Sequence, residues 1–255
     1  MHKVSAYTPF SDFDIKFLNI YLENLKDKVD EIIFIYTGKN LEFNNHILHS
    51  KNIDIKFFDY PVDAPYKWPE GAIRNFAIEQ CKNEWILALD VDEIIDDNIN
   101  SLDLSVPCIY RFNFIPFWYD LKTIRVNADK DSHWYPNKIN RLYHKSKVHY
   151  QENNNHSFYT FTEKDIKDTY LCCYHLHYVD IFNQGMLKPR DNRSGDFQKY
   201  ENLAIDSTGV KIIKDDYFAL NTPENIKKYY ECKTVNYIQS NYPKCLYPYI
   251  NQLLY

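Results

Sequence analysis

The sequence predicts an α/β fold, and three observations point to it. Between residues 4 and 89, apolar runs of strand length alternate with segments whose apolar residues recur at helical spacing. One run, Trp85 to Leu89, is apolar at every position, which is typical of a central strand in a mostly parallel sheet covered on both faces. An acidic segment, Asp90 to Glu93, follows it at the point where open α/β sheets bind ligands.

The first half of the chain is predicted to follow the order β-α-β-β-α-β. Its predicted strands are 4–7, 31–36, 53–60 and 85–89. The first helix follows the capping candidates Ser11 and Asp12 and continues as far as Val29. The second helix begins at Pro69, which suits a first helical turn, and ends near Cys81. This order indicates a parallel sheet with flanking helices.

The second half is predicted to be β-rich and aromatic, with a helical C-terminus. Its predicted strands are 108–118, 121–127, 138–144 and 170–178. Residues 180–203 are predicted to be helical with an interruption at Pro189, and a last helix is predicted from Pro223 to Gln239. The chain has neither an internal repeat nor a low-complexity linker, so we expect a single domain over 1–255.

Composition and charge argue against several classes of protein. Hydrophobic residues make up 45% and charged residues 25% of the chain, which is typical of a globular protein. The net charge is −5 and the basic residues are scattered, so we expect no nucleic-acid partner. The first residues show no signal peptide, and no run reaches the ~18 apolar residues of a membrane span. We therefore expect a soluble, cytoplasmic protein, and peripheral membrane association stays open.

The chain carries no glycine-rich phosphate loop, since neither GxGxxG nor GxxxxGK occurs. This argues against a dinucleotide enzyme and against a P-loop NTPase. A bound nucleoside diphosphate would then need a metal ion and cationic side chains, and Arg74 lies on the helix just before the acidic strand. Asp90 and Asp92 would point to the same side of an extended strand, which suits a hard divalent cation. The alternative for these carboxylates is a solvated acidic loop.

Two segments together resemble the centre of family-2-type glycosyltransferases. They are 71–78, Gly-Ala-Ile-Arg-Asn-Phe-Ala-Ile, and 81–93, Cys-Lys-Asn-Glu-Trp-Ile-Leu-Ala-Leu-Asp-Val-Asp-Glu. That family has a GT-A fold, in which an Arg-Asn helix precedes a strand that ends in a DxD motif. Residues 29–38, Val-Asp-Glu-Ile-Ile-Phe-Ile-Tyr-Thr-Gly, resemble the family's second strand, although many relatives continue with Ser-x-Asp where this chain has Lys-Asn-Leu. The resemblance covers residues 1–115.

The resemblance implies a glycosyltransferase that moves a sugar from a nucleotide-sugar donor, a UDP- or GDP-sugar, to a glycan, lipid or protein acceptor. It also implies a Mn²⁺ or Mg²⁺ cofactor and transfer with inversion. Residues 1–115 would form the nucleotide-sugar-binding half of a GT-A-like domain. Residues 116–215 would form the acceptor and catalytic half, and 216–255 a helical C-terminal extension.

The resemblance also assigns roles to the acidic strand and its neighbours. Asp92 would bind the divalent cation, and Asp90 would hold the ribose or a metal-bound water. Arg74 would contact the pyrophosphate or orient Asp90. The donor site would further be lined by residues near the ends of the first, second and fourth strands, namely Ala6, Thr8, Thr37 and Val91.

Four further candidates lie in the second half. His175 and His177 alternate on one predicted strand and so face one side, and the family often places a histidine from this half on the metal. The alternative is that both histidines pack among tyrosines. Glu152 and His156 are candidates for the base that takes the proton of the acceptor hydroxyl, with a surface loop as the alternative.

Two rival functions stay open. A haloacid-dehalogenase-type phosphatase also uses a strand-end DxD motif, but its motif lies on the first strand and its first aspartate is the nucleophile. Here the motif follows the fourth predicted strand and continues into Glu93. The other rival is a non-catalytic carbohydrate-binding or scaffold protein on a transferase fold, and the intact Asp90, Asp92 and Arg74 argue against it.

Overall fold

The computed structural model describes residues 2–38, 53–60, 62, 69–125, 137–151, 159–179, 211–212, 218–219, 234–236 and 242–252. The base candidates Glu152 and His156 lie outside these described residues, as do the predicted helix over 180–203 and most of the one over 223–239. The described strands form one nine-stranded sheet and two small two-stranded sheets.

The parallel half of the large sheet is built from the first four strands. β3 (Asp54–Asp59), β2 (Glu31–Tyr36), β1 (Val4–Phe10) and β4 (Trp85–Ala88) lie side by side in this order and run parallel. Ala6 of β1 lies opposite Leu87 of β4. The carboxyl ends of β1 and β4 therefore lie at the same edge of the sheet.

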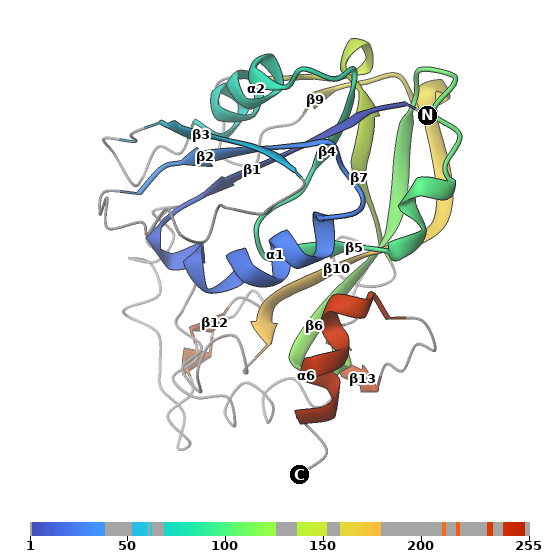
Figure 1. Ribbon diagram of the computed structural model, residues 1–255. Coiled ribbons are helices and arrows are strands. Elements are labelled where there is room, and N and C mark those ends of the chain that lie inside the picture. Colours follow the sequence, from blue (N-terminus) through green and yellow to red (C-terminus); the bar gives the residue numbers. More distant parts are fainter. Residues whose placement is uncertain are drawn as a thin grey trace.

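The second half of the chain adds strands of both directions. From β4 the order continues through β7 (Asn137–His144), β6 (Ile109–Arg125) and β10 (Ile166–Val179) to β5 (Glu93–Ile95), and β13 (Thr234–Asn236) pairs with β6. β7 is antiparallel to both neighbours, whereas β6 and β10 are parallel. Six of the nine strands in the described sheet thus share one direction, which confirms the predicted mostly parallel α/β fold. In Figure 1, β1 to β3 cross the view while β6 and β7 descend through it.

Helices lie on opposite sides of the parallel half, with α2 above it and α1 below it in Figure 1. The first predicted helix begins as a 3-10 helix, η1 (Asp12–Phe17), and continues as α1 (Leu18–Leu25). The second is α2 (Glu70–Gln80). Both predicted helices are thus present, and each packs its apolar residues against one face of the sheet.

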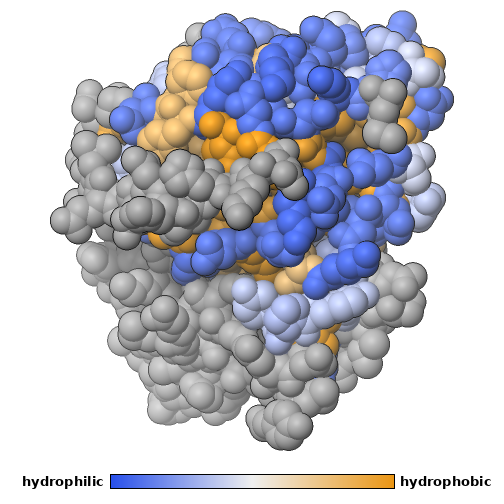
Figure 2. Space-filling model, viewed as in Figure 1, coloured by the Kyte–Doolittle hydropathy of each residue, from blue (hydrophilic) through white to orange (hydrophobic). Residues whose placement is uncertain are grey.

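Strand β4 lies between two hydrophobic cores. Trp85 and Leu87 are buried in the core on the side of α1, whereas Ile86 and Ala88 are buried in the core on the side of α2. Because both faces of β4 are covered, every position of this strand must be apolar. The surface in Figure 2 is mostly hydrophilic where its residues are coloured, with hydrophobic residues concentrated in a band across the middle.

A side chain of α1 covers the outer edge of the short strand β5. The Asn24 Nδ2 atom donates a hydrogen bond to the Ile95 carbonyl at 2.9 Å, and its Oδ1 atom accepts one from the Ile95 N–H at 2.8 Å. These two bonds satisfy main-chain groups that a strand at the end of a sheet would otherwise leave open. Helix α1 thereby fixes β5 and the acidic turn directly before it.

The C-terminal region corrects one predicted helix. Residues 234–236 do not continue the helix predicted to end at Gln239 but form β13, antiparallel to residues 123–125 of β6. The β-branched residues Thr234 and Val235 suit a strand, and pairing with the long β6 gives them main-chain partners that outweigh a weak helical pattern. A short helix is found further along the chain, where no individual helix was predicted: α6 (Tyr247–Gln252), which follows the 3-10 helix η7 (Lys244–Leu246).

The remaining described elements are short. They are η3 (Asp97–Ser101), η4 (Lys145–Lys147), β8 (His149–Tyr150), β9 (Tyr159–Thr160), η5 (Glu163–Asp165), β11 (Lys211–Ile212) and β12 (Phe218–Ala219). β8 pairs with β9, and β11 pairs with β12. Within the described ranges, no helix has the length and hydrophobicity needed to cross a membrane.

Candidate functional site

The acidic segment after β4 is a tight turn and not an extended strand end. The Glu93 N–H donates to the Asp90 carbonyl at 2.9 Å, and β5 then begins at Glu93. The Asp92 carbonyl accepts a hydrogen bond from the Leu176 N–H at 2.8 Å, which fastens the turn to β10. The expectation that Asp90 and Asp92 share one side of a strand is therefore wrong, because the turn gives the two carboxylates different partners.

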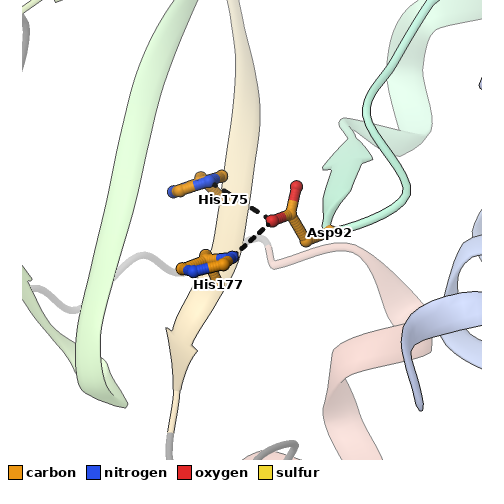
Figure 3. A group of neighbouring side chains, drawn as sticks. All are labelled: Asp92, His175 and His177. Atoms are coloured by element: carbon orange, nitrogen blue, oxygen red, sulfur yellow. Dashed lines mark hydrogen bonds and ion pairs between the residues drawn. The ribbon is translucent and has the colours of Figure 1, made fainter. Parts of the chain in front are cut away.

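Asp92 meets both predicted histidines in a buried cluster (Figure 3). The Asp92 Oδ2 atom lies 2.8 Å from His177 Nδ1 and 3.6 Å from His175 Nε2. The two imidazole rings are stacked, with centroids 5.8 Å apart and an interplanar angle of 10°. This geometry follows from the strand period, since residues two apart on β10 face the same side.

The donor atoms of this cluster fit a divalent transition-metal ion. One ligand atom from each of Asp92, His175 and His177 can be chosen so that all lie within 4.8 Å of one another. One carboxylate oxygen and two imidazole nitrogens suit ions such as Mn²⁺, Fe²⁺ or Zn²⁺. Mg²⁺ prefers a shell of oxygen atoms and keeps several waters, so this donor set favours a transition metal over Mg²⁺.

Asp90 faces two guanidiniums. Its Oδ1 atom lies 2.7 Å from Arg74 Nη2, and its Oδ2 atom lies 3.5 Å from Arg141 Nη2. Burial acts to raise the pKa of Asp90, but the charges of Arg74 and Arg141 outweigh burial and lower this pKa to about 2. Asp90 is therefore a carboxylate whose charge the protein itself compensates.

Glu93 and Arg141 complete the network and had no role in the sequence-based prediction. Arg141 Nη2 lies 2.5 Å from Glu93 Oε1, and Glu93 Oε2 accepts a hydrogen bond from the Asp90 N–H at 3.1 Å. Burial raises the pKa of Glu93 to about 7, against the opposing charge of Arg141. The sequence placed Arg141 on a strand, but the pairing of β7 with β4 that brings it to Asp90 joins distant parts of the chain.

The Arg-Asn pair of α2 has two separate tasks. Arg74 contacts Asp90, and its Nε atom donates to Glu70 Oε1 one helical turn earlier, at 2.8 Å. Its predicted roles, to orient Asp90 or to contact a pyrophosphate, stay predictions. Asn75 hydrogen-bonds the main chain of Tyr150 in β8 in both directions, each bond 2.9 Å long. The i,i+4 spacing of Glu70 and Arg74 is a local signal that could have identified Glu70.

Of the predicted nucleoside-pocket residues, Thr37 and Val91 follow the ends of β2 and β4, whereas Ala6 and Thr8 lie inside β1, which continues to Phe10 and does not end at residue 7. All four side chains are buried. Ala6 and Val91 belong to the core on the side of α1. The Thr37 hydroxyl and N–H both donate to the Phe10 carbonyl at 2.9 Å, and the Thr8 hydroxyl donates to the Pro9 carbonyl at 3.4 Å. Their contact with a nucleoside stays a prediction, as does the role of Glu152 and His156 outside the described residues.

No protein-family model matches the sequence, and no curated protein matches it either. Among solved structures, TarS from S. aureus is similar with a TM-score of 0.45 and 14% identity, over 68% of this chain and 36% of that chain. Its fragment 1–349 in complex with UDP-GlcNAc gives a TM-score of 0.39 and 15% identity, over 56% and 46%. This chain thus spans about a third of the full TarS structure.

Two further solved structures are similar over parts of this chain. The glycosyltransferase GlyE from Streptococcus pneumoniae TIGR4 gives a TM-score of 0.33 and 16% identity, over 44% of this chain and 30% of that chain. A 4-diphosphocytidyl-2C-methyl-D-erythritol synthase from Anaerococcus prevotii gives a TM-score of 0.36 and 13% identity, over 57% and 72%.

Proposed function

We propose that this protein is a metal-dependent glycosyltransferase that moves a sugar from a UDP- or GDP-sugar to a carbohydrate-bearing acceptor. The observation that supports this function best is the meeting of Asp92 with His175 and His177 at the carboxyl end of β4. Two residues earlier in the chain, Asp90 forms its ion pair with Arg74. These residues come from the Arg-Asn helix and the DxD strand through which the sequence resembles family-2 glycosyltransferases.

The charges around the turn favour a bound cation. The groups gathered there carry two guanidiniums and four carboxylates, those of Arg74, Arg141, Glu70, Asp90, Asp92 and Glu93. A divalent cation held by Asp92, His175 and His177 would offset the excess of negative charge and act as a Lewis acid toward the departing nucleoside diphosphate. Arg74 would bring a second positive charge to the same diphosphate.

Of the two predicted cofactors, we favour Mn²⁺ over Mg²⁺. Two of the three donors are imidazole nitrogens, which a transition-metal ion takes more readily than Mg²⁺ does, and Mn²⁺ is the transition-metal ion of the two. Transfer would proceed with inversion, and a base from the second half, Glu152 or His156, would take the proton of the acceptor hydroxyl. Residues 1–115 would bind the nucleotide sugar and residues 116–215 the acceptor, in a cytoplasmic protein.

Isothermal titration calorimetry of UDP and GDP against the full chain, with Mn²⁺ and with EDTA, tests this function. We expect one of the two nucleotides to bind with Mn²⁺ and to lose most of its affinity in EDTA. The matched control is Asp168→Ala, which removes an exposed carboxylate that pairs with Arg111 and Lys138 far along β10 from the histidines. Failure of both nucleotides to bind a folded protein in Mn²⁺ would rule the proposal out.

The phosphatase alternative makes a different prediction, a covalent phosphate on Asp90. The geometry disfavours it, because both carboxylate oxygens of Asp90 face guanidiniums that stabilise the charge a nucleophile must use. Incubation with a reactive phosphate ester followed by peptide mass spectrometry separates the two functions. We expect no adduct, and a phosphorylated Asp90 would favour the phosphatase.

A further inference from the structure

Asn75 fixes a strand that is too short to hold itself in place. β8 has two residues, His149 and Tyr150, and pairs only with the equally short β9 in the described sheets. The Asn75 side chain donates from Nδ2 to the Tyr150 carbonyl and accepts at Oδ1 from the Tyr150 N–H, both at 2.9 Å. One amide thus satisfies both main-chain groups of Tyr150, as a neighbouring strand would.

The side chain of Tyr150 is fixed at its other end by two further tyrosines. The Tyr143 hydroxyl of β7 donates to the Tyr7 hydroxyl of β1 at 3.1 Å, and Tyr7 donates to the Tyr150 hydroxyl at 3.3 Å. All three side chains are buried, and burial raises the pKa of each, so they stay neutral hydroxyls. The Tyr150 ring is therefore held both through its backbone and through its hydroxyl.

The ring of Tyr150 lies beside the guanidinium of Arg74. The Arg74 Cζ atom is 5.8 Å from the ring centroid, within the range of a cation–π contact. Glu70 holds Nε and Asp90 holds Nη2, at 2.8 and 2.7 Å. Arg74 is 6% exposed, and its side chain also interacts with the Tyr7 hydroxyl. The guanidinium is thus held between two carboxylates and two tyrosines.

We propose that Asn75 is a positioning residue for Arg74. By fixing the Tyr150 main chain, Asn75 sets the aromatic ring beside which the guanidinium lies, and so aims Arg74 at Asp90 and at the phosphates of the donor. The part concerning phosphates rests on the proposed function, whereas the orientation of Arg74 does not. Of these two neighbouring residues of α2, Arg74 would then contact Asp90 directly, and Asn75 would orient Arg74 through Tyr150.

A double-mutant cycle on nucleotide affinity tests whether Asn75 acts through Arg74. Calorimetry with UDP or GDP in Mn²⁺ is performed on the wild type, Asn75→Ala, Arg74→Ala and the double variant. We expect Asn75→Ala to weaken binding by roughly 10-fold in the wild type but by less than about 2-fold when Arg74 is absent, since coupled residues are not additive. An equal loss in both backgrounds, or no loss in the wild type, would overturn the proposal.

A second measurement does not require the nucleotide. The Arg74 Nε–H resonance, assigned by ¹⁵N NMR from its loss in Arg74→Lys, should exchange slowly with water in the wild type and at least about 10-fold faster in Asn75→Ala, because a buried, bonded group becomes mobile. Asn100→Ala is the control, because it also removes a side-chain amide that bonds a main-chain group, from Nδ2 to the Asp27 carbonyl at 3.2 Å, but at an exposed position that touches none of the partners of Arg74. We expect it to leave the Arg74 exchange rate unchanged.

The outcomes separate the two hypotheses. If no nucleotide binds the wild type, the proposed function fails and the exchange rate still decides the role of Asn75. If nucleotide binds but Asn75→Ala changes neither affinity nor exchange, only the positioning role fails. If Asn75→Ala does not fold, Tyr150→Leu, which removes the ring, should show the same faster exchange, and Tyr150→Phe, which keeps it, should show less. Equal rates in these two variants would contradict the proposed role of the ring.

Discussion

Asp90 and Asp92 lie two residues apart and occupy two different surroundings. Asp90 faces α2 and β7, where Arg74 and Arg141 compensate its charge. Asp92 faces β10, where the side chains beside it are two stacked imidazoles. The turn closed between Asp90 and Glu93 separates the two environments.

This difference predicts that the two aspartates have different tasks. A carboxylate that is already paired with guanidiniums has little net negative charge left to attract a further cation. A carboxylate beside imidazole nitrogens can bind a metal ion together with them. We therefore expect Asp92 to govern metal binding and Asp90 to govern the orientation of Arg74. The following predictions test this division, beginning with the largest effect.

The largest effect should come from Asp92. Asp92→Ala should abolish Mn²⁺ binding, measured by electron paramagnetic resonance of free Mn²⁺, and with it Mn²⁺-dependent UDP binding. Asp90→Ala should retain Mn²⁺ binding, because its carboxylate is engaged by arginines. Equal loss of Mn²⁺ in the two variants would show that the motif acts as a single ligand group.

The next effect concerns Arg141, which serves the Asp90 side of the turn. Arg141→Met should lower the free energy of unfolding by about 3–5 kcal/mol, since it leaves buried Glu93 without its cationic partner. Urea denaturation at pH 8, where Glu93 of the wild type is ionised, measures this. The control is Arg111→Met, whose pair with Asp168 is exposed and should contribute about 0–1 kcal/mol. Similar losses in both variants would mean that burial of the network contributes little.

Removal of the Arg74 side chain should weaken nucleotide binding more than metal binding. Arg74→Ala should weaken Mn²⁺-dependent UDP or GDP binding by about 1.5–3 kcal/mol, the usual value of a hydrogen bond to a charged group. Its affinity for Mn²⁺ alone should change little, because Asp92, His175 and His177 remain. Calorimetry of both ligands decides this, and a variant with full nucleotide affinity would leave Arg74 with a structural role only.

The smallest effect is a pH dependence of stability that has opposite signs for Glu93 and Asp90. The pKa of Glu93 is raised to about 7 in the folded protein, so its contribution is present below its unfolded pKa and is lost as pH rises through 7. Between pH 5 and 7 the loss should be about 2 kcal/mol. The pKa of Asp90 is lowered to about 2, so its contribution is present at neutral pH and is lost only as pH falls through 2.

Urea denaturation of Glu93→Gln in EDTA tests the first of these signs. The variant should lack the decline in stability between pH 5 and 7 that the wild type shows, because glutamine does not titrate. Control measurements on Asp103→Asn, an exposed carboxylate, should follow the wild type in this range. A decline that persists in Glu93→Gln would place its origin elsewhere.

The sequence predicted those elements that are determined by residues close together in the chain. Strands β1 to β4 and helix α2 follow from apolar runs, a proline at a helix start and the alternation of βα units. His175 and His177 could be placed on one face because their spacing matches the strand period. These features depend on neighbours within a few residues along the chain, and therefore could be read directly.

What the sequence could not predict depends on pairing between distant segments. Arg141 reaches Asp90 only because β7 inserts next to β4, and no local pattern encodes that pairing. The turn at 90–93 was missed because alternating residues also suit an extended strand. The predicted helix around 234–236 failed for the same reason, since the partner that makes these residues a strand is the far end of β6.

The link between Asp92 and His177 joins positions 85 residues apart in the sequence. An ion held there would cross-link the chain across a very long loop, and closing such a loop costs the unfolded chain entropy that a local site would not. The ion would bind the folded chain alone, so it would also raise the temperature of unfolding, by an amount that grows with the logarithm of its concentration divided by its Kd. A catalytic ion at the end of β4 would thus fasten the two halves of the chain to each other.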